Sequence, residues 1–212
     1  MDTRELPAPL ATRRLYLRPC DGDAAAALQA LMAHEDEWRE WQLLRATLAA
    51  EPETTRAWII EREGRPLGAI ALMGIIDACA ETGFMVLAAE RRAGHASEAL
   101  DAVMRYAFED LRIHRLAAAT LAGNPAPGRL LARRGFQREG LLRGACPDGD
   151  RHLDCVLYAR LASDPPPDLP QYLTQYLTPD LTQYLTLTPA SDPCGAASSR
   201  HPSRRSGGRP AS

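Results

Sequence analysis

The sequence contains no lysine, since arginine accounts for all 25 of its Lys and Arg residues. This absence excludes a lysine as a Schiff-base former or amine nucleophile. The sequence also has no run of about 20 apolar residues, which a membrane-spanning helix would need. Residues 1–9 carry acidic side chains and no apolar signal-peptide segment. We therefore expect a cytoplasmic protein with no membrane partner.

Cysteine is also scarce, and no two cysteines form a C-x-x-C pair. The five positions are Cys20, Cys79, Cys146, Cys155 and Cys194. An odd number without metal-ligand spacing predicts neither a zinc site nor a disulfide framework, so we expect no metal. Cys155 lies in a strand pattern and is expected to be buried and inert. Cys146 and the acidic residues after it are interpreted as a loop.

The composition of the chain changes sharply after Leu161. Before this point, apolar residues recur with helix and strand periods, and 45% of the whole chain is hydrophobic. After it come three consecutive prolines, Pro165–Pro167, then three copies of Gln-Tyr-Leu-Thr and a Ser, Gly, Pro and Arg-rich end. We predict one domain over 10–163 and a low-complexity, disordered tail over 164–212. The net charge of -2 does not indicate a polyanion binder. The arginines of the tail leave nucleic-acid binding as an alternative, but a solvated tail is the favoured interpretation.

The periodicity of residues 10–161 predicts a mixed α+β domain around one sheet. A helix over 24–32 is expected to be capped by Asp23, and a second helical stretch over 35–48 contains Trp38 and Trp41. Strands are expected over 14–18, 57–62, 67–73, 82–87, 116–121, 136–139 and 155–161, with further helices over 95–111 and 127–134. The segments 57–62 and 67–73 should form a hairpin around residues 63–66.

The most informative segment runs from Val86 to Leu100, where a strand leads through a basic loop into a helix. The first N–H groups of a helix have no intrahelical partners, and the helix dipole makes them an anion site. Gly94 and Ala96 allow close backbone approach, and Arg91 and Arg92 add positive charge. The residues alone leave two interpretations, a phosphate-binding turn or an Arg-rich surface turn before an amphipathic helix.

The motif Arg91-x-x-Gly94-x-Ala96 resembles the acetyl-CoA motif Q/R-x-x-G-x-G/A of the GNAT superfamily of N-acetyltransferases. Residues 12–18 resemble the opening strand of the branch that acetylates the N-termini of ribosomal proteins. Further landmarks of that branch follow in order: Gly83-Phe84, Ser97-Glu98-Ala99-Leu100, His114-Arg115, Asn124, Gly135-Phe136, Glu139-Gly140, Asp154 and Tyr158. The resemblance covers about residues 10–161.

This resemblance implies the GNAT fold, a mostly antiparallel sheet flanked by helices and splayed between its fourth and fifth strands. It implies acetyl-CoA as co-substrate and a primary amine as acceptor, either a protein N-terminus or a small molecule. It also implies a set of coenzyme-binding residues on the splayed strand, the loop and the next strand's end: Phe84, Met85, Val86, Arg91, Arg92, Ala93, Gly94, His95, Ala96, Ser97 and Asn124. Of these, His95 is expected to face phosphate or solvent.

The resemblance places the general base at Glu81, where relatives often have a carboxylate. A solvated Glu at a strand end is the alternative, and His114 is a weaker candidate base. The general acid departs from the family pattern, because Pro127 and Leu131 occupy the positions where relatives have Ser or Tyr. Water or Tyr158 would then protonate the thiolate, and a non-catalytic module that binds acyl-CoA or a partner remains the alternative function.

Overall fold

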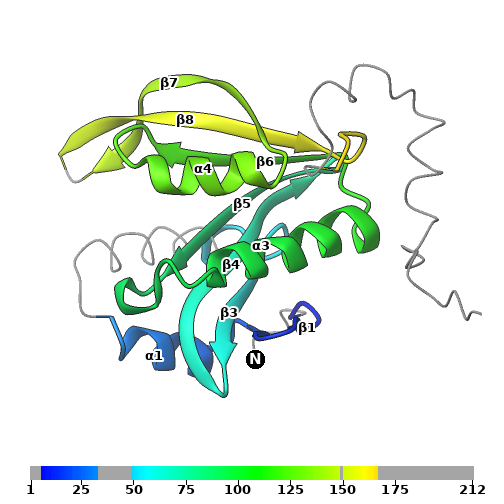
Figure 1. Ribbon diagram of the computed structural model, residues 1–212, viewed down its shortest axis with the longest axis vertical. Helices are drawn as coiled ribbons and strands as arrows, with labels where there is room; N and C mark the ends of the chain where they lie inside the picture. Colours follow the sequence, from blue (N-terminus) through cyan, green and yellow to red (C-terminus); the bar gives the residue numbers. More distant parts are fainter. Residues whose placement is uncertain (1–5, 33–48, 149, 167–212) are drawn as a thin grey trace, which may run out of the picture. The chain divides into compact units, whose positions relative to one another are not determined.

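The computed structural model describes residues 6–32, 49–148 and 150–166, which form an eight-stranded sheet with helices packed on it (Figure 1). The strand order is β1-β2-β3-β4-β5-β6-β8-β7. The strands are β1 (Leu10–Ala11), β2 (Tyr16–Pro19), β3 (Arg56–Arg62), β4 (Arg65–Ile76), β5 (Cys79–Val86), β6 (Arg115–Leu121), β7 (Gln137–Asp148) and β8 (Arg151–Leu161). The helices are α1 (Gly22–Gln29), α3 (His95–Arg105) and α4 (Pro125–Arg133). The predicted mixed fold is confirmed. The helical stretch predicted over 35–48 and all but the first residues of the predicted tail lie outside the described residues.

The predicted hairpin is present as β3 and β4. Arg62 pairs with Arg65, so the connecting loop has two residues, Glu63 and Gly64. Both have positive φ, 53° and 77°, which is the geometry of a type I′ turn. This turn matches the twist of the two strands and sets their register as far as Glu61, beyond which a bulge shifts it.

Alternating side chains on β3 divide the core between the two faces of the sheet. Trp58 and Ile60 pack in a cluster with Val103 of α3, whereas Ile59 packs in a second cluster with Leu28 of α1. This is the period-two pattern of a strand buried on both faces. Figure 1 shows α3 and α4 on the near side of the sheet, and Leu131 of α4 belongs to the same cluster as α3.

The sheet opens between β5 and β6. This is its one parallel pair among the described residues, and it joins only Cys79 to Arg115, Ala80 to Leu116 and Glu81 to Ala117. Beyond Glu81, β5 continues to Val86, paired on one side only, with β4. The predicted splay between the fourth and fifth strands is therefore present between β5 and β6, because the short β1 adds one strand to the count.

Two helix starts differ from the predictions. The side chain that caps α1 is Asp21, whose carboxylate accepts from the Ala24 N–H, and Asp23 lies inside the first turn. Asp23 was the wrong residue because the helix begins two residues earlier than expected. Helix α4 begins at Pro125 instead of Pro127. Proline is tolerated at both positions, since neither N–H has an intrahelical partner there.

The two C-terminal strands pair more extensively than predicted, and they carry a disulfide between Cys146 and Cys155. The expectation of no disulfide, with Cys146 in a loop and Cys155 as an inert thiol, is therefore wrong. A break in the register between Leu142 and Cys146 brings the two cysteines together, with their Cα atoms 6.1 Å apart. Such a separation suits a disulfide. The nine-residue spacing of the two cysteines does not reveal the disulfide, because their approach depends on the register shift.

Candidate functional site

The loop between β5 and α3, residues 87–94, presents the start of a helix without a side-chain cap. The loop contains a short 3-10 turn, η1 (Ala88–Glu90), and left-handed residues at Arg92 (φ 64°) and Gly94 (φ 81°). Gly94 is the N-cap of α3 and forms no capping side-chain bond. The N–H groups of the first turn are thus left to bind an external acceptor, which an anion provides best.

The end of β5 beside this loop has backbone groups directed away from β4. The Leu87 N–H bonds to the Leu67 carbonyl of β4 at 2.8 Å. Because successive peptide groups alternate along a strand, the N–H and carbonyl of Val86 point to the opposite side. Arg91 Nε donates to the Val86 carbonyl at 3.0 Å. That bond ties the loop to the strand end and uses only the carbonyl of Val86.

A cavity of about 610 Å³ lies between the loop, the end of β5 and α4. Ten of the eleven predicted coenzyme residues line it, and only Ala93 does not. The lining residues from β5 and the loop are Phe84, Met85, Val86, Ala88, Glu90, Arg91, Arg92, Gly94, His95, Ala96 and Ser97, and those from α4 and its cap are Asn124, Ala126, Pro127, Arg129, Leu130 and Arg133. The structure thus brings together segments that lie about 30 positions apart in the chain.

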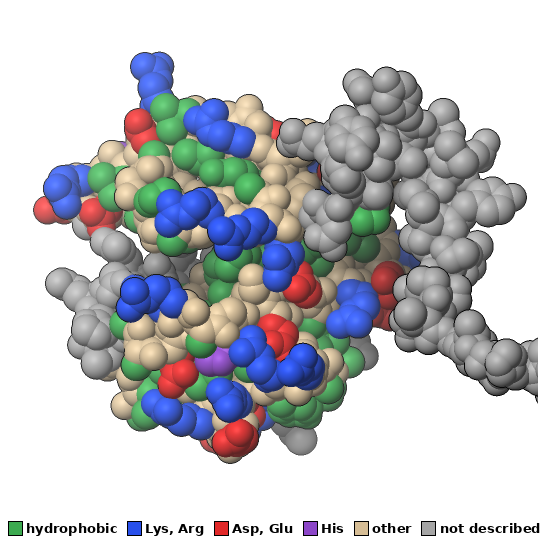
Figure 2. Space-filling model, viewed as in Figure 1, with side chains coloured by type: hydrophobic (Ala, Val, Ile, Leu, Met, Phe, Trp, Pro, Cys, Tyr) green, Lys and Arg blue, Asp and Glu red, His purple; other side chains and the backbone are tan. Residues whose placement is uncertain are grey.

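Two arginines of this cavity, Arg129 and Arg133, were missed by the sequence reasoning. They lie four residues apart on α4 and so occupy one helix face. Together with Arg91 and Arg92 they bring the number of arginines that line the cavity to four, against the single acidic residue Glu90. Figure 2 shows basic side chains gathered over this face of the molecule. The spacing in Pro125–Arg133 was the signal available in the sequence.

Asn124 fulfils a structural role in addition to lining the cavity. Its side-chain oxygen accepts from the Ala126 N–H at 3.3 Å and so caps α4. The side-chain amide nitrogen is the part of Asn124 that remains to donate to a ligand.

His95 does not face solvent, so that part of the expectation for its side chain is wrong, whereas a phosphate-facing role stays a prediction because His95 lines the cavity. The residue is 3% exposed, and neither ring nitrogen has a hydrogen-bond partner. Its Nδ1 lies 3.9 Å from Glu90 Oε2, which is too long for a hydrogen bond. The other oxygen of Glu90 pairs with Arg65 at 3.2 Å. His95 is buried because the first turn of α3 directs this side chain towards η1.

Glu81 lies at the last paired position before β5 and β6 diverge, and it is not part of the cavity lining. By strand alternation it shares a face with Met85, which packs in the α1 cluster, so it lies across the sheet from α3. Glu81 is exposed as a whole residue, yet partial burial of its carboxyl group raises its pKa, and a hydrogen bond with the Ala119 backbone opposes that rise. A carboxyl in this state accepts a proton more readily than an ordinary surface glutamate.

The other candidate residues are separated from the cavity or lack a proton to give. His114 is exposed at the start of β6, where its N–H bonds to the Ala78 carbonyl at 2.6 Å. Pro127 lines the cavity, and Leu131 is buried in the core. Tyr158 packs under α4 against Gly128 and does not line the cavity.

Within the described ranges, no group of three His, Cys, Asp or Glu residues could hold a metal ion. In the same ranges, no helix has the length and apolar character that crossing a bilayer requires.

Known proteins resemble the chain in both sequence and fold. Residues 14–137 match the model of the Acetyltransferase (GNAT) domain family. The uncharacterized N-acetyltransferase YoaA of Bacillus subtilis is 31% identical over 151 residues, which cover 63% of this chain and 85% of YoaA. Mycobacterium smegmatis RimJ, solved in complex with CoA-disulfide, superposes with a TM-score of 0.64 at 21% identity, covering 87% of this chain and 95% of RimJ. RimL, a ribosomal α-N-protein acetyltransferase solved with coenzyme A, gives 0.64 at 18% identity, covering 73% and 98%. At these identities the two solved structures show a shared fold.

Proposed function

The chain belongs to the GNAT acetyltransferase family, and we propose that it transfers the acetyl group of acetyl-CoA to a primary amine. The observation that carries this proposal is the cavity beside the uncapped start of α3. It combines unpaired helix N–H groups with four arginines, a combination suited to a ligand with several phosphate groups.

In this proposal the coenzyme occupies the cavity along its length. The phosphates contact the first turn of α3, and Arg129 and Arg133 contribute charge from the opposite wall. The pantetheine arm lies along the free edge of β5, where the Phe84 and Val86 peptide groups point away from β4. This arrangement extends the sheet by one strand-like segment, a common way of holding extended chains.

Transfer requires a neutral amine whose nitrogen attacks the thioester carbonyl carbon. The carbon–sulfur bond breaks, an amide forms, and the thiolate takes a proton. We assign the Val86 N–H to the developing oxyanion, because it points to the free edge of the strand. Glu81 accepts the proton of the amine, directly or through water, from the opposite face of the sheet at the splay. Water protonates the thiolate, since Pro127 and Leu131 carry no hydroxyl.

The acceptor is a protein N-terminus or a small amine in this proposal. The fold shared with RimL and RimJ supports the first, since RimL is named as an acetyltransferase of a ribosomal protein. A peptide with a free N-terminal amine and a small polyamine are therefore the two acceptors to compare first.

The test uses the full chain and a variant with Arg91→Ala and Gly94→Glu, which removes one charge and adds an anion at the left-handed cap. Acetyl-CoA at about 100 times its Kd stabilises a binding protein by about 2.7 kcal/mol, a rise of several degrees in Tm. We expect that rise in the wild type and not in the variant, followed by thiol release with an amine acceptor. No rise at millimolar acetyl-CoA contradicts the proposal, and a rise without thiol release from any amine supports the non-catalytic binding module instead.

A further inference from the structure

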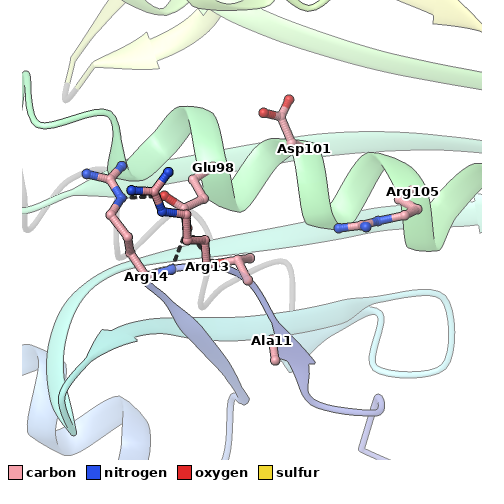
Figure 3. A pocket seen from close by; sticks show the side chains of 7 residues that line it. Ala11, Arg13, Arg14, Glu98, Asp101 and Arg105 are labelled. Carbon is pink, nitrogen blue, oxygen red and sulfur yellow. Dashed lines mark hydrogen bonds and ion pairs between the residues drawn. The ribbon is translucent and has the colours of Figure 1, made fainter. Parts of the chain in front are cut away.

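A second recess lies outside the cavity, where the segment between β1 and β2 packs on the first turns of α3 (Figure 3). Its volume is about 660 Å³. The lining residues are Ala11, Thr12, Arg13, Arg14, Glu98, Asp101 and Arg105. None of these residues lines the cavity between α3 and α4.

Three of them form a connected group that we call the brace: Thr12, Arg14 and Glu98. The Glu98 carboxylate accepts three hydrogen bonds, from Thr12 Oγ1 at 2.6 Å, from the Arg14 N–H at 2.8 Å and from Arg14 Nε at 2.6 Å. Burial alone would raise the pKa of Glu98, but these bonds and the Arg14 charge lower it. The carboxylate is therefore ionised and fully engaged at neutral pH.

The brace also reaches the 87–94 loop itself. Arg14 Nη1 donates to the Ala93 carbonyl at 3.1 Å. Its Nη2 lies 3.2 Å from the point where a side chain on Gly94 would begin. One guanidinium thus contacts both α3 and the two loop residues that precede it. Because Thr12 and Leu15 close a tight turn on the strand side, the group that holds the loop is itself fixed.

The position of Glu98 creates an electrostatic problem that Arg14 solves. Glu98 is the fourth residue of α3, about 5 Å along the axis from His95. An unpaired carboxylate at that distance opposes the binding of phosphate groups to the same helix start. The Arg14 guanidinium neutralises this charge from outside, since Arg14 does not line the cavity.

From these contacts we infer that Thr12, Arg14 and Glu98 position the 87–94 loop for an anionic coenzyme, with Arg14 neutralising Glu98. This inference rests on the proposed function for the identity of the coenzyme. The three residues act through the loop and do not touch the reacting atoms, so they affect coenzyme affinity and not the chemical step.

The test compares four full-length proteins: wild type, Arg14→Ala, Arg14→Ala/Glu98→Gln, and Arg13→Ala as matched control. Arg13 lines the same recess and carries the same charge but takes no part in the brace. We expect Arg14→Ala to raise the KM for acetyl-CoA about tenfold with kcat within about twofold. The KM of the double variant should be only about threefold above that of the wild type, because the double variant has no unpaired carboxylate. The KM of Arg13→Ala should match that of the wild type.

A purely structural role predicts a different order, with the double variant as weak as Arg14→Ala or weaker. That order, or an equal effect of Arg13→Ala, overturns the inference. Hydrogen exchange of residues 93–98 in the coenzyme-free proteins tests the loop separately from the proposed function. Faster exchange in Arg14→Ala than in Arg13→Ala supports the brace even if the ligand differs from acetyl-CoA, and equal exchange contradicts it.

Discussion

The contact between α4 and β8 predicts a steric limit at Gly128. A Cβ built on Gly128 would lie 2.5 Å from the Tyr158 hydroxyl oxygen and 3.1 Å from its Cζ atom. Both separations are tighter than ordinary van der Waals contact, so Gly128→Ala forces α4 or the Tyr158 ring to move. Since α4 forms one wall of the cavity, a displacement of α4 should also change coenzyme binding.

The magnitude follows from two opposing effects. Replacing glycine by alanine inside a helix stabilises by about 1 kcal/mol, and overpacking a core contact costs about 1–3 kcal/mol. Gly128→Ala should therefore lower the free energy of unfolding by up to about 2 kcal/mol. Tyr158→Phe removes the nearest atom, the hydroxyl oxygen. The double variant should therefore be more stable than the sum of the two single changes predicts, with a coupling energy of about 1 kcal/mol or more.

Urea denaturation of wild type, both single variants and the double variant measures this coupling. Gly22→Ala in α1 is the control, because nothing lies within 4 Å of its Cβ position. The same four proteins should show a raised KM for acetyl-CoA in Gly128→Ala that Tyr158→Phe partly restores. If Gly128→Ala stabilises the protein as Gly22→Ala does, the close approach of α4 to β8 is refuted.

Substitutions at three places in the site give further predictions. Glu81→Gln should lower kcat/KM by a factor of about 10²–10⁴. Because burial raises the Glu81 pKa, wild-type activity should fall as the pH drops through that raised value. The pH–rate profile of the variant should lack this acidic fall in activity. The same raised pKa means that ionised Glu81 does not stabilise the fold, so Glu81→Gln should leave Tm at neutral pH unchanged or higher. Replacing Arg129 and Arg133 by alanine should weaken acetyl-CoA binding more at low salt than at high salt, measured by calorimetry. His95→Phe should raise the free energy of unfolding, measured in urea, by about 1 kcal/mol, because it removes two buried ring nitrogens that have no hydrogen-bond partner. A lower free energy of unfolding would show that the imidazole does have a hydrogen-bond partner.

The coenzyme side of the site was predictable because it is local in sequence. Residues 84–97 run from strand to loop to helix without interruption, so the spacing of Arg91, Gly94 and Ala96 places them at the helix start. The structure confirms that start at His95. The side chain of His95 was not predictable in the same way, because its burial depends on packing against η1.

Several of the parts that escaped prediction depend on how strands pair and on contacts between separate segments. Arg14 and Glu98 are 84 residues apart, and the Cys146–Cys155 disulfide depends on a register shift within β7. Neither the hydrophobic periodicity nor the composition of the sequence encodes such a pairing. Gly128 illustrates the same point, since only the opposing Tyr158 explains why this helix interior carries the residue least favourable to a helix after proline. Most of the predicted binding residues follow one another from β5 to α3, whereas their supports Arg14 and Tyr158 come from other segments of the chain. Substitutions at the supporting positions are therefore where the structure makes predictions that the motif alone cannot.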